Sequence, residues 1–154
     1  MSARTLPRER ATRMTPNQVD LIRASWASVE PIQDVAGTLF YDRLFELDPA
    51  LRRLFRNADM AQQKKILMQT LTVVVKSLDR LDQLVPAVEA LGRRHAGYGV
   101  RPEHYETVGA ALLWTLGQGL GEAFTSDVER AWTQAYSTLA SVMIAAAEGE
   151  AVAA

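Results

Sequence analysis

Helix-start signals followed by apolar stripes recur along nearly the whole chain. Thr15-Pro16, Asp48-Pro49 and Pro102 each place a capping residue or a proline at the start of such a segment. After each start, apolar residues repeat at steps of three and four, as on the buried face of a helix. No segment has a convincing strand pattern. The chain is therefore predicted to form one all-α domain of six or seven helices with short connections.

Composition excludes several classes of protein. The 154 residues, 48% of them hydrophobic, suit one domain with a single core. A formal net charge of −1 gives no reason to expect nucleic acid as a partner. The chain has no cysteine, so disulfides and thiolate metal sites are excluded. With no apolar run of about 18 residues and no secretory-type N-terminus, we expect no membrane span and a cytoplasmic location.

The two ends differ in character from the middle. Residues 1–14 are rich in arginine and poor in aliphatic side chains, so we expect a mobile basic tail; a surface-binding arm is the alternative. The folded domain is expected over residues 15–147. Residues 148–154 are expected to form a short C-terminal tail.

Several internal boundaries follow from the same signals. Gly37 should permit another helix to cross closely, and a long helix is expected from about Met60 to Leu78. Residues 79–84 are expected to be a linker, after which Pro86 opens the next helix. Ser126 is expected to begin a capping box for the last helix.

His95 extends the apolar stripe of its helix. Val88, Leu91 and His95 follow one another at steps of three and four, so the imidazole is predicted to face inward. A buried imidazole needs a hydrogen-bond partner or a metal, because an unpaired buried polar group costs roughly 1–3 kcal/mol. This stripe alone does not distinguish two roles for His95, a hydrogen-bonded core histidine and a metal ligand. The second histidine, His104, is expected at the surface.

Three further side chains are polar or aromatic where their local stripe points inward. They are Tyr41, Phe55 and Gln63, on successive helices or helix ends. Together with His95 they could line a pocket that has a metal ligand on one side and hydrogen-bond donors on the other. A core tyrosine and a solvated helix glutamine are the simpler readings of Tyr41 and Gln63.

The order of these residues resembles the globins, in particular bacterial single-domain globins and the haem domain of flavohaemoglobins. The resemblance runs from about Thr15 to Ile144. The matching segments are Leu39-Phe40-Tyr41, Asp48-Pro49 through Leu54-Phe55, Leu91-Gly92-Arg93-Arg94-His95, Gly99-Val100-Arg101-Pro102-Glu103-His104-Tyr105, and Ala131-Trp132 with Ala135-Tyr136. It implies a globin fold of six to eight helices around a haem pocket.

The resemblance also implies a role for each pocket residue. His95 would be the proximal ligand of the iron of haem b, and Phe55 would wedge against the porphyrin. Tyr41 and Gln63 would be the distal pair that stabilises a bound gas. Leu67 and Leu71 would close the distal side against water. The proximal contacts would be Leu91, Val100, Tyr105 and Val108, while Arg94 and Tyr98 would orient His95 or reach a propionate.

One position departs from the flavohaemoglobin pattern. A glutamate on the last helix normally pairs with the equivalent of Tyr105, but here that place falls on Ala147, with Glu148 one residue later. A shift of one residue turns a helical side chain by about 100°, so Glu148 is not expected to take the place of that glutamate. Strong donation of electron density from the proximal histidine to the iron is therefore not expected. No flavin or nicotinamide domain is expected in the chain.

These features favour a globin that binds O₂, with NO and CO as further ligands. Oxygen transport and nitric-oxide detoxification are both compatible with it. Nitric-oxide dioxygenation with a separate reductase is the enzymatic alternative, with Tyr41 and Gln63 as its distal residues. A gas or redox sensor and a haem-free helical interaction module are the remaining alternatives.

Overall fold

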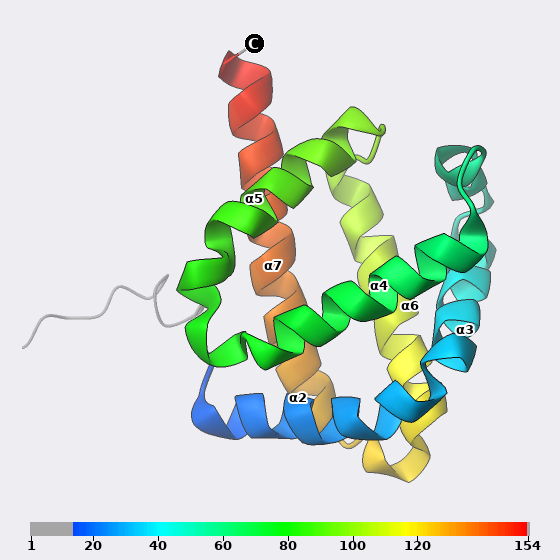
Figure 1. Ribbon diagram of the computed structural model, residues 1–154, viewed down its shortest axis with the longest axis vertical. Helices are drawn as coiled ribbons and strands as arrows, with labels where there is room; N and C mark the ends of the chain where they lie inside the picture. The colour runs from blue at the N-terminus through cyan, green and yellow to red at the C-terminus, as the bar shows by residue number, and fades with distance from the viewer. Residues whose placement is uncertain (1–13, 154) are drawn as a thin grey trace, which may run out of the picture.

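A computed structural model describes the backbone of residues 14–153 and the side chains of residues 14–149 (Figure 1). The predicted basic tail, apart from Met14, lies outside the described residues. Met14 itself packs against the core. Within residues 14–153 the chain is helical with no strand, which confirms the all-α prediction.

Six α-helices and four short 3₁₀ segments make up the described chain. The α-helices are α2 (Pro16–Val29), α3 (Gln33–Leu47), α4 (Met60–Lys76), α5 (Leu81–Gly97), α6 (Pro102–Leu120) and α7 (Ser126–Ala153). The 3₁₀ segments are η1 (Glu30–Ile32), η2 (Pro49–Phe55), η3 (Leu78–Arg80) and η4 (Gly121–Ala123).

The predicted caps form the first turns of α2 and η2. The Gln18 N–H donates to Thr15 Oγ1 at 3.1 Å, and the Thr15 N–H donates to Gln18 Oε1 at 3.1 Å, which completes the capping box. The Ala50 N–H donates to Asp48 Oδ1 at 3.1 Å. These side chains satisfy N–H groups that have no partner inside their own helix.

Three predictions of local structure were wrong, namely the role of Pro86, the linker before it and the cap of the last helix. Pro86 lies inside α5 and does not open it, because the helix already begins at Leu81. The expected linker at 79–84 is instead the end of η3 and the first turn of α5. At α7 the Val128 N–H donates to Thr125 Oγ1 at 3.3 Å, so the cap is Thr125 and Ser126 is the first helical residue. The helix continues to Ala153, through the segment expected to be a C-terminal tail.

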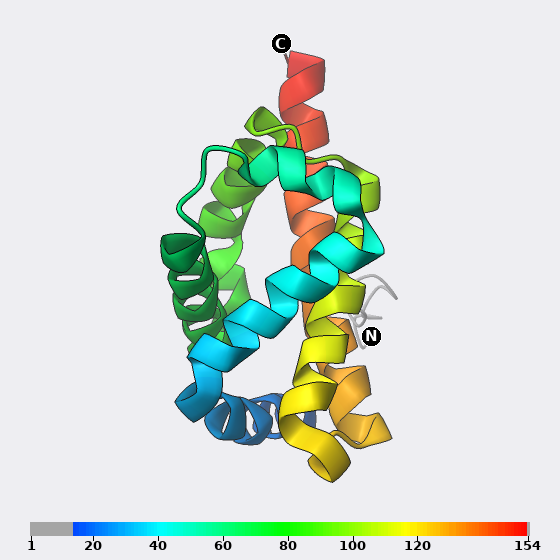
Figure 2. The same cartoon turned by 90° about the vertical axis from the view of Figure 1, so that its right-hand side faces the viewer.

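The helices pack in pairs around one core. α5 packs against α7, which it crosses, α3 packs on α6 and α4, and α2 contacts α4, α6 and α7 (Figures 1 and 2). The side chains at the centre are large and apolar, among them Ile22, Trp26, Leu44, Leu116 and Trp132. No helix of the described chain is long and apolar enough to cross a membrane.

Two glycines set close helix crossings. A Cβ added to Gly92 would lie 2.6 Å from the Met143 Cα, so α5 approaches the backbone of α7 at this point. A Cβ on Gly37 would lie 3.1 Å from the Lys64 Cβ, which confirms the predicted close crossing of α3 by another helix, here α4. The first crossing lies one turn before His95, and the second lies beside Gln63.

Candidate functional site

His95 is half-buried near the C-terminal end of α5, and its ring has a defined hydrogen bond. Its Nδ1 lies 2.8 Å from the Leu91 carbonyl oxygen. A carbonyl only accepts, so Nδ1 carries the proton and Nε2 keeps a free lone pair. Burial lowers the pKa of His95 below its ordinary value; the bond to Leu91 opposes this, and the charge of Arg94 adds to it. The neutral imidazole can therefore act as a metal ligand through Nε2.

The end of α5 holds His95 in place through its backbone. The Tyr98 N–H lies 3.1 Å from the carbonyl oxygens of both Arg94 and His95, and the Val100 N–H donates to the His95 carbonyl at 3.0 Å. Gly99 has a φ of 98°, a left-handed conformation that suits glycine at a helix end. The turn after His95 is thus closed by hydrogen bonds.

Tyr41 and Gln63 lie side by side across the α3–α4 crossing. Tyr41 is buried, with 3% of its surface exposed. Gln63 Nε2 donates to Tyr41 Oη at 3.1 Å. Burial raises the pKa of Tyr41 above its ordinary value, and the hydrogen bond from Gln63 lowers it by less. In this hydrogen bond the phenol oxygen of Tyr41 is the acceptor, so the tyrosine O–H remains free to donate to another acceptor.

Phe55 completes a cluster of aromatic rings beside Tyr41. The Phe55 ring meets Tyr41 edge-on at a centroid distance of 5.5 Å and meets Phe45 at 5.6 Å. Such edge-to-face pairs add roughly 0.5–1.5 kcal/mol beyond simple burial. The structure therefore brings Tyr41, Phe55 and Gln63 into one group. It records no direct contact between this group and His95 among the described residues.

The predicted apolar lining is only half-buried. This holds for the two distal leucines and for the proximal side chains, namely Leu67, Leu71, Leu91, Val100, Tyr105 and Val108. On α4 the fully buried residues are Met68 and Val75, which face the core. The half-buried set is apolar surface that helix packing alone does not cover.

Arg94 and Tyr98 are exposed, and Tyr98 has 70% of its surface accessible. Neither side chain takes part in the hydrogen bond that orients His95, which comes from Leu91. The hydrogen bond that orients the ring comes instead from the carbonyl one turn earlier, which occupies Nδ1. A propionate contact from either residue stays a prediction.

Sequence reasoning missed a hydrogen bond between α6 and α7 next to the proximal residues. Tyr136 Oη donates to the Tyr105 carbonyl at 2.6 Å. Burial, followed by the nearby Tyr105, raises the pKa of Tyr136 strongly. The predicted stripe of α7 includes Tyr136, but a stripe gives no hydrogen-bond partner. At the position where a proximal glutamate was considered, Ala147 is half-buried and Glu148 is exposed.

Comparisons with known proteins agree on one family. The Globin family model matches residues 38–143. The flavohemoprotein of Vibrio cholerae serotype O1 is 33% identical over 133 residues, which is 85% of this chain and 34% of that protein. Neuroglobin of Tetraodon nigroviridis is 31% identical over 144 residues, which is 85% of this chain and 91% of that protein.

A solved structure has a similar fold. It is a hexacoordinated heme protein from an anhydrobiotic tardigrade, crystallised at pH 4, with a TM-score of 0.80 at 18% identity, covering 90% of this chain and 98% of that one. The chain spans about a third of the length of the flavohemoproteins that it matches. The family model covers more than half of the chain, and the similarity to neuroglobin extends over nearly all of that relative. The chain belongs to the globin family.

Proposed function

We propose that this globin holds haem b through His95 and binds O₂, with NO and CO as further ligands. The observation that carries the proposal is the His95 ring, which is half-buried, has Nδ1 bonded to the Leu91 carbonyl, and leaves Nε2 free. Haem iron held by His95 would supply the site at which a diatomic gas binds. The half-buried Leu67, Leu71 and Leu91 fit an apolar porphyrin, since haem would cover the surface that the helices leave open.

The chain's own residues would then act on the bound gas. Tyr41 would donate its hydroxyl proton to the gas, because Gln63 already donates to the phenol oxygen. In a buried site such a hydrogen bond is electrostatically stronger than in water. Phe55 would support the Tyr41 ring and pack against the porphyrin. On the other side, the Leu91 carbonyl would fix the tautomer and orientation of His95.

The Tyr41→Phe substitution tests the distal role. Removing one donor is worth about 1 kcal/mol, so the O₂ dissociation rate should rise by about threefold to tenfold, and autoxidation should speed up. Flash photolysis or stopped-flow mixing of the loaded protein measures the rate. The matched control is Thr133→Val, which removes the hydroxyl of an exposed residue on α7 that has no proposed role in haem binding. An equal rate in both variants would show that Tyr41 does not donate to the gas.

Nitric-oxide dioxygenation is the second candidate. Its support is the buried Tyr41–Gln63 pair together with the similarity to flavohemoproteins. The net reaction combines NO and O₂ with one electron to give nitrate, and the electron would come from a separate reductase. Nitrate formed per NO consumed, measured with an NO electrode and a chemical reductant, tests it. Turnover no faster than that of free hemin would contradict it.

The residues around His95 favour reversible gas binding over a chemistry that needs strong activation of bound O₂. Glu148 is exposed and so does not replace a buried glutamate, and the half-buried Ala147 has no polar atom in its side chain. The His95 ring would therefore receive one neutral partner, the Leu91 carbonyl, on its second nitrogen. A cytoplasmic location remains a prediction.

A further inference from the structure

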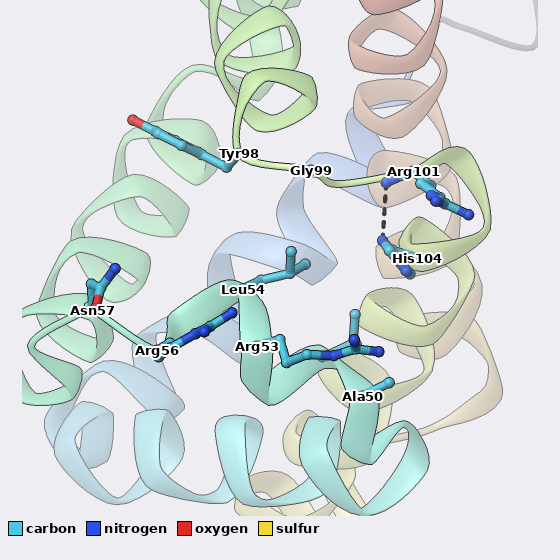
Figure 3. Close-up of a pocket in the computed structure, with 10 residues that line it drawn as sticks. Ala50, Arg53, Leu54, Arg56, Asn57, Tyr98, Gly99, Arg101 and His104 are labelled. Atoms are coloured by element: carbon cyan, nitrogen blue, oxygen red, sulfur yellow. Dashed lines mark hydrogen bonds between the residues drawn. The ribbon is translucent and has the colours of Figure 1, made fainter.

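A cavity of about 780 Å³ lies between η2 and the loop that joins α5 to α6 (Figure 3). We call it the arginine hollow. Leu51 and Leu54 of η2 supply its apolar part, and the loop supplies Tyr98 and Gly99. Figure 3 shows the Tyr98 ring pointing away from the rest of the lining, so the interior is formed mainly by the residues described next.

Three arginines line the arginine hollow from its two sides. Arg53 and Arg56 come from η2 and its C-terminal end, and Arg101 comes from the residue that precedes α6 (Figure 3). All three are exposed and none pairs with a carboxylate among the described residues. Other arginines of the described chain do have carboxylate partners within 4.0 Å, namely Arg23, Arg43, Arg80 and Arg130. Three arginines without a carboxylate partner therefore line one cavity, and guanidinium groups bind carboxylate and phosphate well.

His104 adds a fourth donor on the same side as Arg101. The Arg101 backbone N–H donates to His104 Nδ1 at 2.9 Å (Figure 3). The neutral ring therefore carries its proton on Nε2, which leaves that nitrogen as a donor. The start of α6, a helix of 19 residues, adds the positive end of its dipole at the same place.

No carboxylate lines the arginine hollow. Four acidic residues lie within two positions of the lining along the chain: Asp48, Asp59, Glu103 and Glu106. The carboxylates of Asp48 and Asp59 accept from the N–H groups of Ala50 and Ala61. None of the four belongs to the lining. An anion bound here would therefore meet guanidinium, imidazole and amide groups without an opposing negative charge.

The arginine hollow lies beside the proposed haem site and shares with it one residue, Tyr98, whose contact with a propionate is a prediction. Its lining does not include His95, Tyr41 or Gln63. A Cβ added to Gly99 would lie 3.3 Å from Leu54 Cδ2, so the Leu54 side chain lies against the loop that follows α5. The next residue, Phe55, turns its ring toward Tyr41 and Phe45. Adjacent residues of η2 thus contact two different groups: Leu54 lines the arginine hollow, and Phe55 packs in the aromatic cluster beside Tyr41.

We propose that the arginine hollow binds a small free anion with two or more phosphate or carboxylate groups. Arg53 and Arg56 would bind one group, and Arg101 with His104 would bind the other. The carboxylates of a haem in the adjacent site are the competing source of the same chemistry, and the test separates the two.

Calorimetric titration with pyrophosphate, before and after the protein is loaded with hemin, tests the proposal. We expect binding to both forms, weakened about tenfold by Arg53→Gln or by Arg101→Gln, since each removes a charge-assisted contact. The control Arg130→Gln removes an arginine that pairs with Asp127 and does not line the hollow. The affinity of this variant for pyrophosphate should equal that of the wild-type protein. The ring signals of His104 in NMR spectra should shift as pyrophosphate is added.

Three results would overturn the proposal. They are no binding to either form, an equal loss in Arg130→Gln, and binding to the haem-free protein that disappears on loading, which would assign the hollow to the carboxylates of haem. The Soret band of each hemin-loaded variant is recorded in parallel and tests the proposed function alone. A variant with a normal Soret band but weaker pyrophosphate binding would separate the anion site from haem binding.

Discussion

The direction of two hydrogen bonds decides what the buried polar residues can do. At His95 the Leu91 carbonyl accepts from Nδ1, so the ring offers a lone pair at Nε2. At Tyr41 the Gln63 amide donates to the phenol oxygen, so the tyrosine offers its proton. These directions suit the roles proposed for the two residues, His95 as a ligand for iron and Tyr41 as a donor to a bound gas.

The raised pKa of Tyr41 leads to a prediction about pH. Burial favours the neutral phenol, so the hydroxyl stays protonated and able to donate below its ordinary pKa of about 10. We expect the ratio of O₂ dissociation rates between Tyr41→Phe and the wild-type protein to stay constant from about pH 6 to pH 9. Stopped-flow rates across this range measure it. A ratio that falls toward one as the pH approaches 9 would mean that the hydroxyl ionises there.

At this scale the sequence predicts residue types well and their partners poorly. The spacing of Val88, Leu91 and His95 predicts an inward imidazole, and the structure shows it half-buried and bonded to Leu91. The roles of Arg94 and Tyr98 could not be judged, because a side chain's exposure depends on helices that are distant in sequence. Likewise, His104 was expected to be a simple surface residue, yet it is half-buried and accepts from Arg101.

Among the elements, α5 depends most on a single close approach. Gly92 allows its backbone to lie against α7, and His95 follows one turn later. A methyl group at this position would meet backbone atoms of Met143, which no side-chain rotation can relieve. The position of His95 is therefore tied to the absence of a side chain at Gly92.

We expect Gly92→Ala to destabilise the protein by about 1–3 kcal/mol, the usual cost of overpacking, and to weaken haem retention. Thermal unfolding followed by circular dichroism, and transfer of hemin to an acceptor protein, measure the two effects. Gly97→Ala is the matched control, because an added Cβ there meets nothing within 4 Å. Equal behaviour of the two variants would show that α5 does not need this close contact.

Helix starts were predictable where a capping side chain and proline act together, as at Thr15-Pro16 and Asp48-Pro49. The start of α5 was not, because Pro86 looks like a first-turn residue when its neighbours in space are unknown. Proline lacks an N–H, so it removes a hydrogen bond within α5. Packing against α7 gives α5 a support that local sequence does not reveal.

Across the whole molecule, α2 and α7 connect the two sides of the proposed haem site. Trp26 Nε1 donates to Thr72 Oγ1 at 3.1 Å and joins α2 to α4, while Trp132 Nε1 donates to Ser25 Oγ at 2.9 Å and joins α7 to α2. Because α5 packs on α7, the placement of His95 relative to Gln63 is set through this chain of contacts. The all-α architecture was predictable from periodicity, but these long-range pairs were not, since single-sequence patterns carry no contact information.

The central claim is that His95 holds haem in this globin. The most direct test is the visible absorption spectrum of the purified protein after hemin is added, recorded as ferric, after dithionite reduction, and after O₂ is admitted. The claim predicts a Soret band that shifts on reduction and again with O₂. In His95→Gly it predicts that the band is weakened and then restored by free imidazole, which would occupy the space left by the ring. A folded protein whose spectrum remains that of free hemin would contradict the claim.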